Sequence, residues 1–168
     1  MNANRRQFLA AAAAMPFAPA LVAAPDTDRR NRLGVVQYSF ALRLATERAA
    51  GKTGLADPLT FLEHCHELGA GGVQIGLGTR APEYLAALRK KAEAHGMDLE
   101  GTIHLPKDDT DCERFMAEVR SAREAGIKIL RTVLLGGRRY EQFTRSDDFR
   151  RACTQAEQSV KLAEPIVA

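Results

Sequence analysis

The sequence has few cysteines, little net charge and no long hydrophobic run, and each shortage argues against a class of protein. The three cysteines, Cys65, Cys112 and Cys153, are an odd number and form no CxxC pair. Neither a disulfide framework nor a zinc site built on paired cysteines is therefore indicated. We expect the thiols to lie on helices and to act as small hydrophobic side chains.

The charge is nearly balanced once the N-terminal segment is set aside. The chain of 168 residues holds 24 Lys and Arg against 21 Asp and Glu. Residues 1–24 contain Arg5 and Arg6 but no acid, which leaves 22 basic residues against 21 acidic ones. Nucleic-acid-binding domains usually carry a clustered basic surface, so we expect no nucleic-acid partner.

The N-terminal segment resembles a bacterial twin-arginine export signal. Arg5 and Arg6 precede an aromatic–leucine pair and a weakly hydrophobic, alanine-rich stretch that runs to residue 24. This stretch is shorter than the roughly 20 residues of a spanning helix and contains two prolines, which argues against an anchor. A basic tail without a targeting role is the alternative. The resemblance implies recognition by the export machinery, cleavage near residue 24, a linker over 25–32 and a periplasmic or other extracytoplasmic location.

From Leu33 onward, short apolar runs alternate with amphipathic segments. The expected strands cover 33–40, 72–77, 99–105 and 129–135, and the expected helices cover 57–68, 82–95, 111–125 and 146–163. Gly69, Gly96 and Gly126 follow three of these helices, where a left-handed residue is favoured. A parallel connection must cross back over its sheet, usually through a helix. The pattern therefore predicts an α/β fold of parallel (β/α) repeats. Its four βα units are about half of an eight-fold barrel, which usually has ~250 residues.

His104 is the strongest candidate for a catalytic residue, because it lies near the end of the expected third strand. Ligands in parallel α/β proteins bind beyond the carboxyl ends of the strands. On the expected third strand, Glu100, Thr102 and His104 share one face. A polar face is costly on a central strand unless it lines a solvated interior. A catalytic role for His104 therefore stands beside a structural one, in which the imidazole bonds a loop carbonyl.

Two arginines near the fourth expected strand could likewise have either a structural role or a role in binding a ligand. Arg131 lies within the apolar run and needs a counter-charge, for which Glu100 on the neighbouring strand is the candidate. We expect a structural ion pair between them. Arg138 follows two glycines beyond the strand and could hold a phosphate or carboxylate, or simply be solvated in a turn.

Uncharged polar residues at the other strand ends could bind the hydroxyl groups of a sugar or polyol. These residues are Gln37, Tyr38 and Gln74. Their side chains can donate and accept hydrogen bonds, although such residues alone are weak indicators of a site.

Several stretches together resemble the first half of the xylose-isomerase-like TIM barrels. They are residues 34–40 (GVVQYSF), 68–74 (LGAGGVQ) and 94–97 (AHGM), and residues 131–141 are similar to a segment of exported, twin-arginine-bearing bacterial members. The likeness runs from Leu33 to about Ala168. It implies the N-terminal half of a TIM barrel, truncated after the fourth βα unit. The implied activity is that of a sugar or sugar-phosphate isomerase or epimerase that uses a divalent metal.

The resemblance carries over few site residues. Its metal ligands lie on the fifth to eighth strands, so none is assigned here, and Gln74 stands where the family often has a glutamate base. His104 matches the third-strand position, where a substrate contact or an electrostatic role is implied. One hypothesis is therefore an incomplete, inactive copy of an isomerase. The other is a half barrel that binds carbohydrate, or associates with another half barrel through exposed strand edges, without catalysis. An apurinic-site endonuclease of the same superfamily is disfavoured by the charge and the export signal.

Overall fold

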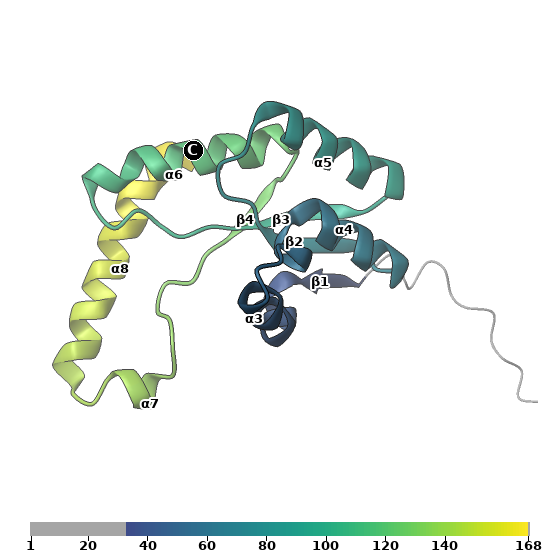
Figure 1. Cartoon of the computed structure of the whole chain (residues 1–168). Coiled ribbons are helices and arrows are strands. Elements are labelled where there is room, and N and C mark those ends of the chain that lie inside the picture. Colours follow the sequence, from purple (N-terminus) through teal and green to yellow (C-terminus); the bar gives the residue numbers. More distant parts are fainter. Residues whose placement is uncertain (1–32, 168) are drawn as a thin grey trace, which may run out of the picture.

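The computed structural model describes residues 33–167, which form an α/β fold around one parallel sheet (Figure 1). The expected signal over 1–24 and the linker over 25–32 lie outside the described residues. The strands are β1 (Gly34–Val36), β2 (Gly72–Gly76), β3 (Asp98–Thr102) and β4 (Ile129–Arg131), in the order β1-β2-β3-β4. The helices are η1 (Gln37–Phe40), α3 (Ala41–Ala49), η2 (Gly54–Ala56), α4 (Pro58–Glu67), α5 (Pro82–His95), η3 (Asp109–Asp111), α6 (Cys112–Glu124), α7 (Arg139–Gln142) and α8 (Ser146–Val167).

The strand register gives the sheet two unlike faces. Val73 pairs with Leu99, and one residue further on Gln74 pairs with Glu100. Since side chains alternate along a strand, Val73 and Leu99 point to one face and Gln74 and Glu100 to the other. The first face packs against helices. We call the second, which carries Gln74, Glu100 and Arg131, the open face.

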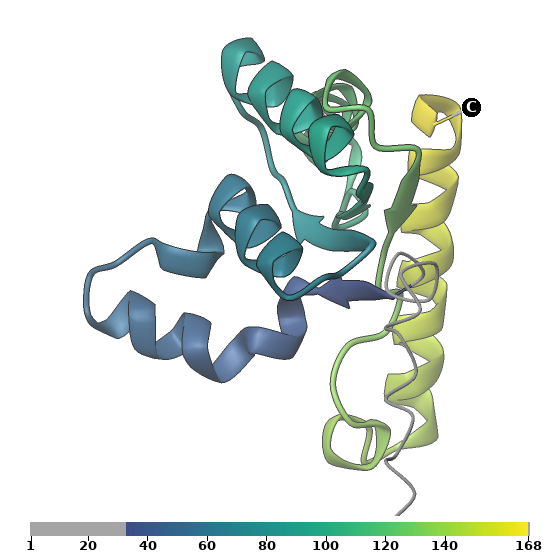
Figure 2. The same cartoon turned by 90° about the vertical axis from the view of Figure 1, so that its right-hand side faces the viewer.

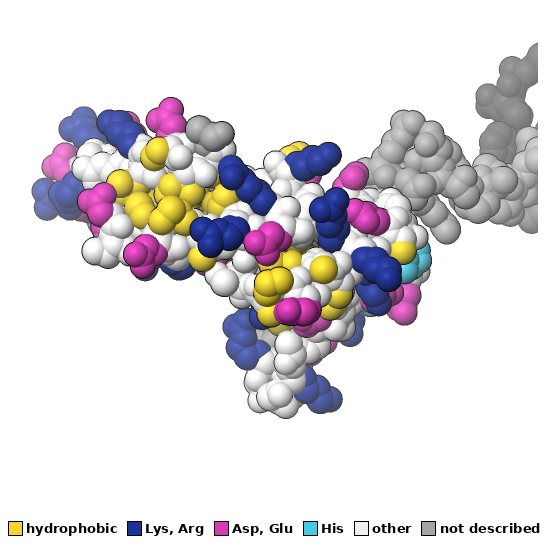
Figure 3. Space-filling view, turned by 90° about the horizontal axis from the view of Figure 1, so that it is seen from above, with side chains coloured by type: hydrophobic (Ala, Val, Ile, Leu, Met, Phe, Trp, Pro, Cys, Tyr) yellow, Lys and Arg dark blue, Asp and Glu magenta, His cyan; other side chains and the backbone are white. Residues whose placement is uncertain are grey.

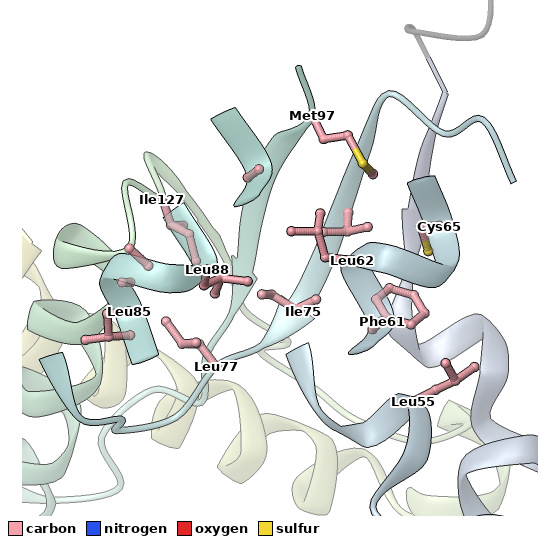
Figure 4. Packing of buried hydrophobic residues seen from close by; sticks show 14 residues of the cluster. Leu55, Phe61, Leu62, Cys65, Ile75, Leu77, Leu85, Leu88, Met97 and Ile127 are labelled. Atoms are coloured by element: carbon pink, nitrogen blue, oxygen red, sulfur yellow. The ribbon is translucent and has the colours of Figure 1, made fainter. Parts of the chain in front are cut away.

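The main core fills the space between the sheet and the helices α4 and α5 (Figures 2 and 4). Phe61, Leu62 and Cys65 of α4 and Leu88 of α5 are fully buried there, together with Ile75 of β2. Figure 4 shows these side chains pointing toward one another from the helices and the strand. This face therefore has the apolar cover that a parallel sheet requires.

A second, smaller core joins α8 to α6. Phe115 and Val119 of α6 pack with Ile103, which follows β3, and with Ala163 near the end of α8. Only the C-terminal part of α8 takes part in this cluster. Figure 1 shows its N-terminal part and α7 reaching away from the sheet, connected to β4 by a long extended segment.

The fold confirms the predicted class and most of the predicted elements. The helix α5 has the predicted bounds, and Gly69, Gly96 and Gly126 have φ values of 75°, 61° and 81°, as their positions after helices require. The predictions were wrong at the ends of three strands. β1 ends at Val36, where the chain turns into η1, β3 ends at Thr102 instead of Leu105, and β4 ends at Arg131 instead of Leu135. His104 therefore follows β3 and does not share a strand face with Glu100 and Thr102.

Helix α3 was missed by the sequence analysis. Its residues Ala41–Ala49 contain no buried side chain, and only Leu44 of them packs in part against the main core. None of the described helices is both long enough and apolar enough to span a bilayer.

Candidate functional site

Three polar side chains form a connected row across the open face. The Gln74 amide nitrogen donates to Glu100 Oε2 at 3.0 Å, and the Arg131 guanidinium donates to Gln74 Oε1 at 3.3 Å. Arg131 pairs in the register with Thr102 of β3, so its side chain crosses that strand to reach β2. Gln74 therefore lies between a carboxylate on one side and a guanidinium on the other.

The structure corrects the predicted ion pair between Glu100 and Arg131. Within the described part of the chain, no ion pair joins Glu100 directly to Arg131. Both groups contact Gln74 instead, because the amide can accept from the guanidinium and donate to the carboxylate at the same time. Gln74 and Glu100 are half-buried and Arg131 is exposed, so the row is accessible from the open face.

A hollow lies beside this row, at the amino ends of the strands. It has a volume of about 220 Å³ and is bordered by Gln74, Asp98 and Glu100. Part of its lining comes from Gly34 and Gly72, which pair with each other and have no side chains to fill it. The open face therefore combines a polar row with adjoining free volume.

Gln37 has a positioning role in the structure. Its amide nitrogen donates to the carbonyl oxygens of Leu55 at 2.8 Å and Ala56 at 3.3 Å, and its Oε1 accepts from the Gly76 amide at 3.2 Å. These bonds tie η2 to the carboxyl end of β2. Since both ends of the amide are used by backbone groups, the predicted role in substrate binding would require them to be released.

His104 lies just beyond the end of β3, with its side chain exposed. The Arg114 guanidinium donates to the carbonyl oxygens of His104 at 3.2 Å and Leu105 at 3.4 Å, so helix α6 fixes the backbone here. His104 borders a pocket of about 390 Å³ between the segment after β4 and helix α8. The structure thus separates His104 from the row, because Glu100 lies at the middle of β3 and His104 lies beyond its carboxyl end.

The two remaining candidates lie at the rim. Tyr38 follows β1 within η1 and its side chain is 83% exposed. Arg138 donates to Glu141 Oε1 at 3.0 Å, and both side chains are largely exposed. Such an exposed pair constrains Arg138 only weakly, so its guanidinium can turn toward a ligand.

The described residues do not fit a metal centre. They contain no group of three or more His, Cys, Asp or Glu side chains arranged to hold an ion. The two imidazoles that come closest, those of His66 and His95, stack face to face at 3.7 Å on the helical side, and His95 also contacts Glu63. Stacked rings do not direct their nitrogens to a common point.

Hydrophobic side chains also gather on the surface. Figure 3 shows such a gathering at the end of the molecule formed by α6 and α8. At the β4 edge of the sheet, Ile129, Val133 and Leu134 are at least half exposed, and Leu33 is exposed beside β1. Both edge strands of the sheet therefore have apolar neighbours without cover in the described structure.

The sequence analysis missed the contribution of α8 to the pocket beside His104. Gln155, Ala156 and Ser159 line this pocket from the helix, and Gln155 also donates to the Lys107 carbonyl oxygen at 3.0 Å. These residues are separated from His104 by about fifty positions, and no motif connects them. An apolar stripe on α8 was the only available signal.

Comparison with known proteins yields no relative: no family model, curated protein or solved structure matches the chain significantly.

Proposed function

We propose that the chain supplies the first four βα units of a sugar or sugar-phosphate isomerase or epimerase of the xylose-isomerase-like TIM barrel type. The supporting architecture is a four-stranded, wholly parallel sheet with helices on one face. The observation that carries the proposal is the row of Gln74, Glu100 and Arg131 on the opposite face. We also propose that the twin-arginine signal containing Arg5 and Arg6 directs export of the chain to the periplasm.

The chemistry of this row suits a polyol. Sugar hydroxyl groups both donate and accept hydrogen bonds, and the row offers a carboxylate acceptor, a guanidinium donor and an amide that does both. The existing bonds within the row hold these side chains in place before a ligand arrives, which reduces the entropy lost on binding. Tyr38 and Arg138 would add contacts at the rim, the latter to a phosphate.

The open face is also where a barrel would place its interior. Parallel sheets are normally covered on both faces, and helices of the described residues 33–167 cover only one. In a closed (β/α) barrel the helices form the outer layer and the opposite face lines the interior. The row of the proposed sugar site then lies inside the barrel at the middle of β2 and β3, with the hollow toward the amino ends of the strands.

We propose His104 for acid–base or electrostatic work, which requires a bound sugar to extend from the row past the carboxyl end of β3, because the structure separates His104 from the row. A histidine can transfer a proton near neutral pH, which the movement of a hydrogen between neighbouring sugar carbons requires. The divalent metal implied by the family resemblance would need ligands other than the described residues, since these do not form a metal centre. No step of the proposal for this chain passes through it.

Sugar binding to the full chain tests the proposal. In saturation-transfer NMR with xylose, xylitol and glucose 6-phosphate, we expect at least one of them to bind the wild type. Gln74→Leu should weaken that binding about fivefold or more, because the row loses its central hydrogen bonds. Gln158→Leu removes an exposed amide on α8 and is the matched control. Equal binding by both variants, or none by the wild type, would reject the open face as the sugar site.

A second function, supported by a different observation, is self-association without catalysis. The exposed apolar residues lie at both edges of the sheet, Leu33 beside β1 and Ile129 and Leu134 at and after β4. Because all four strands are parallel, β4 of one copy has the polarity to pair with β1 of another. Two such contacts related by a twofold axis would close the assembly.

A further inference from the structure

The pocket beside His104 has walls of two kinds. Its volume of about 390 Å³ falls within the range of small-molecule sites. One wall is apolar and consists of Leu105, Val133, Leu134, Leu135, Phe143, Ala152 and Ala156. The polar lining consists of His104, Lys107, Gln155 and Ser159, together with the backbone of Gly136.

The lining has no negative charge. Among the described residues that border this pocket none is an Asp or Glu, whereas Lys107 is cationic and the His104 ring can donate a hydrogen bond. None of the carboxylates that closely follow Lys107 in sequence borders the pocket. Asp108 accepts from the amides of Thr110 and Asp111, and Asp111 pairs with Arg114 at 2.7 Å. The positive charge at the pocket is therefore not cancelled by the lining itself.

The basic residues sit on a segment that is held from two sides. Arg114 of α6 donates to the His104 carbonyl oxygen, and Gln155 of α8 donates to the Lys107 carbonyl oxygen at 3.0 Å. The Lys107 amide is also fixed, since it donates to Asp111 Oδ2 at 3.1 Å. A backbone held in this way fixes the positions from which both side chains extend, which reduces the entropy lost on binding.

We propose that this pocket binds a small organic carboxylate with an apolar body. The carboxylate would contact Lys107 and His104, and the apolar body would lie against Val133, Leu134 and Phe143. A polyol would bury hydroxyl groups against that apolar wall without partners, which is unfavourable. The site is separate from the row on the open face, and this inference does not rest on the proposed sugar-binding function.

Benzoate and its neutral analogue benzamide distinguish charge recognition from simple apolar contact. We would titrate each into the isotopically labelled full chain and follow the backbone amides by NMR. We expect benzoate to shift the resonances of residues 104–107 and 133–136 and to bind about fivefold more tightly than benzamide, because a charge-assisted contact adds to the apolar one. Equal affinity for the two compounds, or shifts confined to other regions, would overturn the proposal.

Two variants with a control test the assigned residues. Lys107→Met keeps most of the side-chain volume and should weaken benzoate binding about three- to tenfold, with little effect on benzamide. Lys128→Met removes the same charge at the opposite end of β4 and should leave both affinities unchanged. Ala156→Leu should fill the pocket and weaken both compounds. If Lys107→Met behaves like Lys128→Met, the pocket does not recognise the carboxylate.

Discussion

At the scale of single residues, Tyr84 and Asp57 form the most constrained polar contact of the described chain. The Tyr84 hydroxyl donates to Asp57 Oδ2 at 2.6 Å and accepts from the Leu59 amide at 3.1 Å. Burial and the neighbouring Asp57 raise the pKa of Tyr84 to about 12, so it remains a donor at neutral pH. Burial alone would raise the pKa of Asp57, but hydrogen bonds from Tyr84 and Thr60 outweigh it and hold this pKa below its usual range.

We expect Tyr84→Phe to lower the free energy of unfolding by about 1–2 kcal/mol at pH 7. The pKa of Asp57 is lower in the folded chain than in the unfolded one. Its carboxylate therefore stabilises the fold at pH values above the unfolded-state pKa, and this stabilisation is lost as the pH falls through the folded-state pKa. The difference between wild type and variant should therefore shrink below about pH 4. Urea unfolding at neutral and acid pH measures it, with Tyr38→Phe at an exposed position as the control. A difference that grows in acid would contradict this account.

Cysteine reactivity is a second property set by single residues. Cys65 is fully buried, and burial raises the pKa of its thiol to about 11, whereas Cys112 and Cys153 are half-buried. The thiolate is the reactive form, so iodoacetamide should modify Cys112 and Cys153 before Cys65 in the folded chain. Peptide mass spectrometry over time gives the order. Comparable rates for Cys65 in native buffer and in urea would mean that α4 does not pack as described.

At the scale of elements, the contact between β2 and β3 is closest at Gly72. A Cβ atom added there would lie 2.9 Å from the Asp98 carbonyl oxygen, whereas at Gly76 on the same strand the nearest atom is 3.9 Å away. The first distance requires the backbone of β3 to move. We expect Gly72→Ala to lower the free energy of unfolding by about 1–3 kcal/mol and Gly76→Ala to change it by less than about 0.5 kcal/mol.

Chemical unfolding of the two variants measures the difference. Because both substitutions remove a glycine from β2, their effects on the unfolded chain are matched. Equal losses of stability in the two variants would show that the backbone of β3 does not lie close to Gly72.

Elements with a strong local signal were predictable from the sequence, and those formed by tertiary contacts were not. Helix α5 carries a proline at its start, a glycine after its end and an apolar stripe including Leu85 and Leu88, so its bounds were clear. The early end of β4 has no such signal, since Val133, Leu134 and Leu135 are apolar but leave the sheet. For the candidate site, the strand ends indicated Gln74 and His104. The bridging role of Gln74 depends on strand register, which the sequence does not specify.

At the scale of the whole molecule, the uncovered sheet edges determine how copies of the chain would interact. We predict that the full chain self-associates in a concentration-dependent way, because edge strands with apolar neighbours favour pairing. Leu134→Lys should shift the population toward monomer, since it places a charge beside β4. Leu68→Lys substitutes an equally exposed leucine after α4, away from the edges, and is the control. Light scattering after size-exclusion chromatography distinguishes the species; a monomer at all concentrations would contradict the edge-pairing account.

The central claim is that the open face of the sheet binds a sugar or polyol, and NMR mapping of the bound face tests it most directly. Titration of xylitol into the isotopically labelled full chain should shift the side-chain amide of Gln74 and the backbone amides of Glu100 and Arg131. Residues on the helix-covered face, such as Ile75, should remain unaffected. Shifts confined to the helices, or none at saturating xylitol, xylose and glucose 6-phosphate, would contradict the claim.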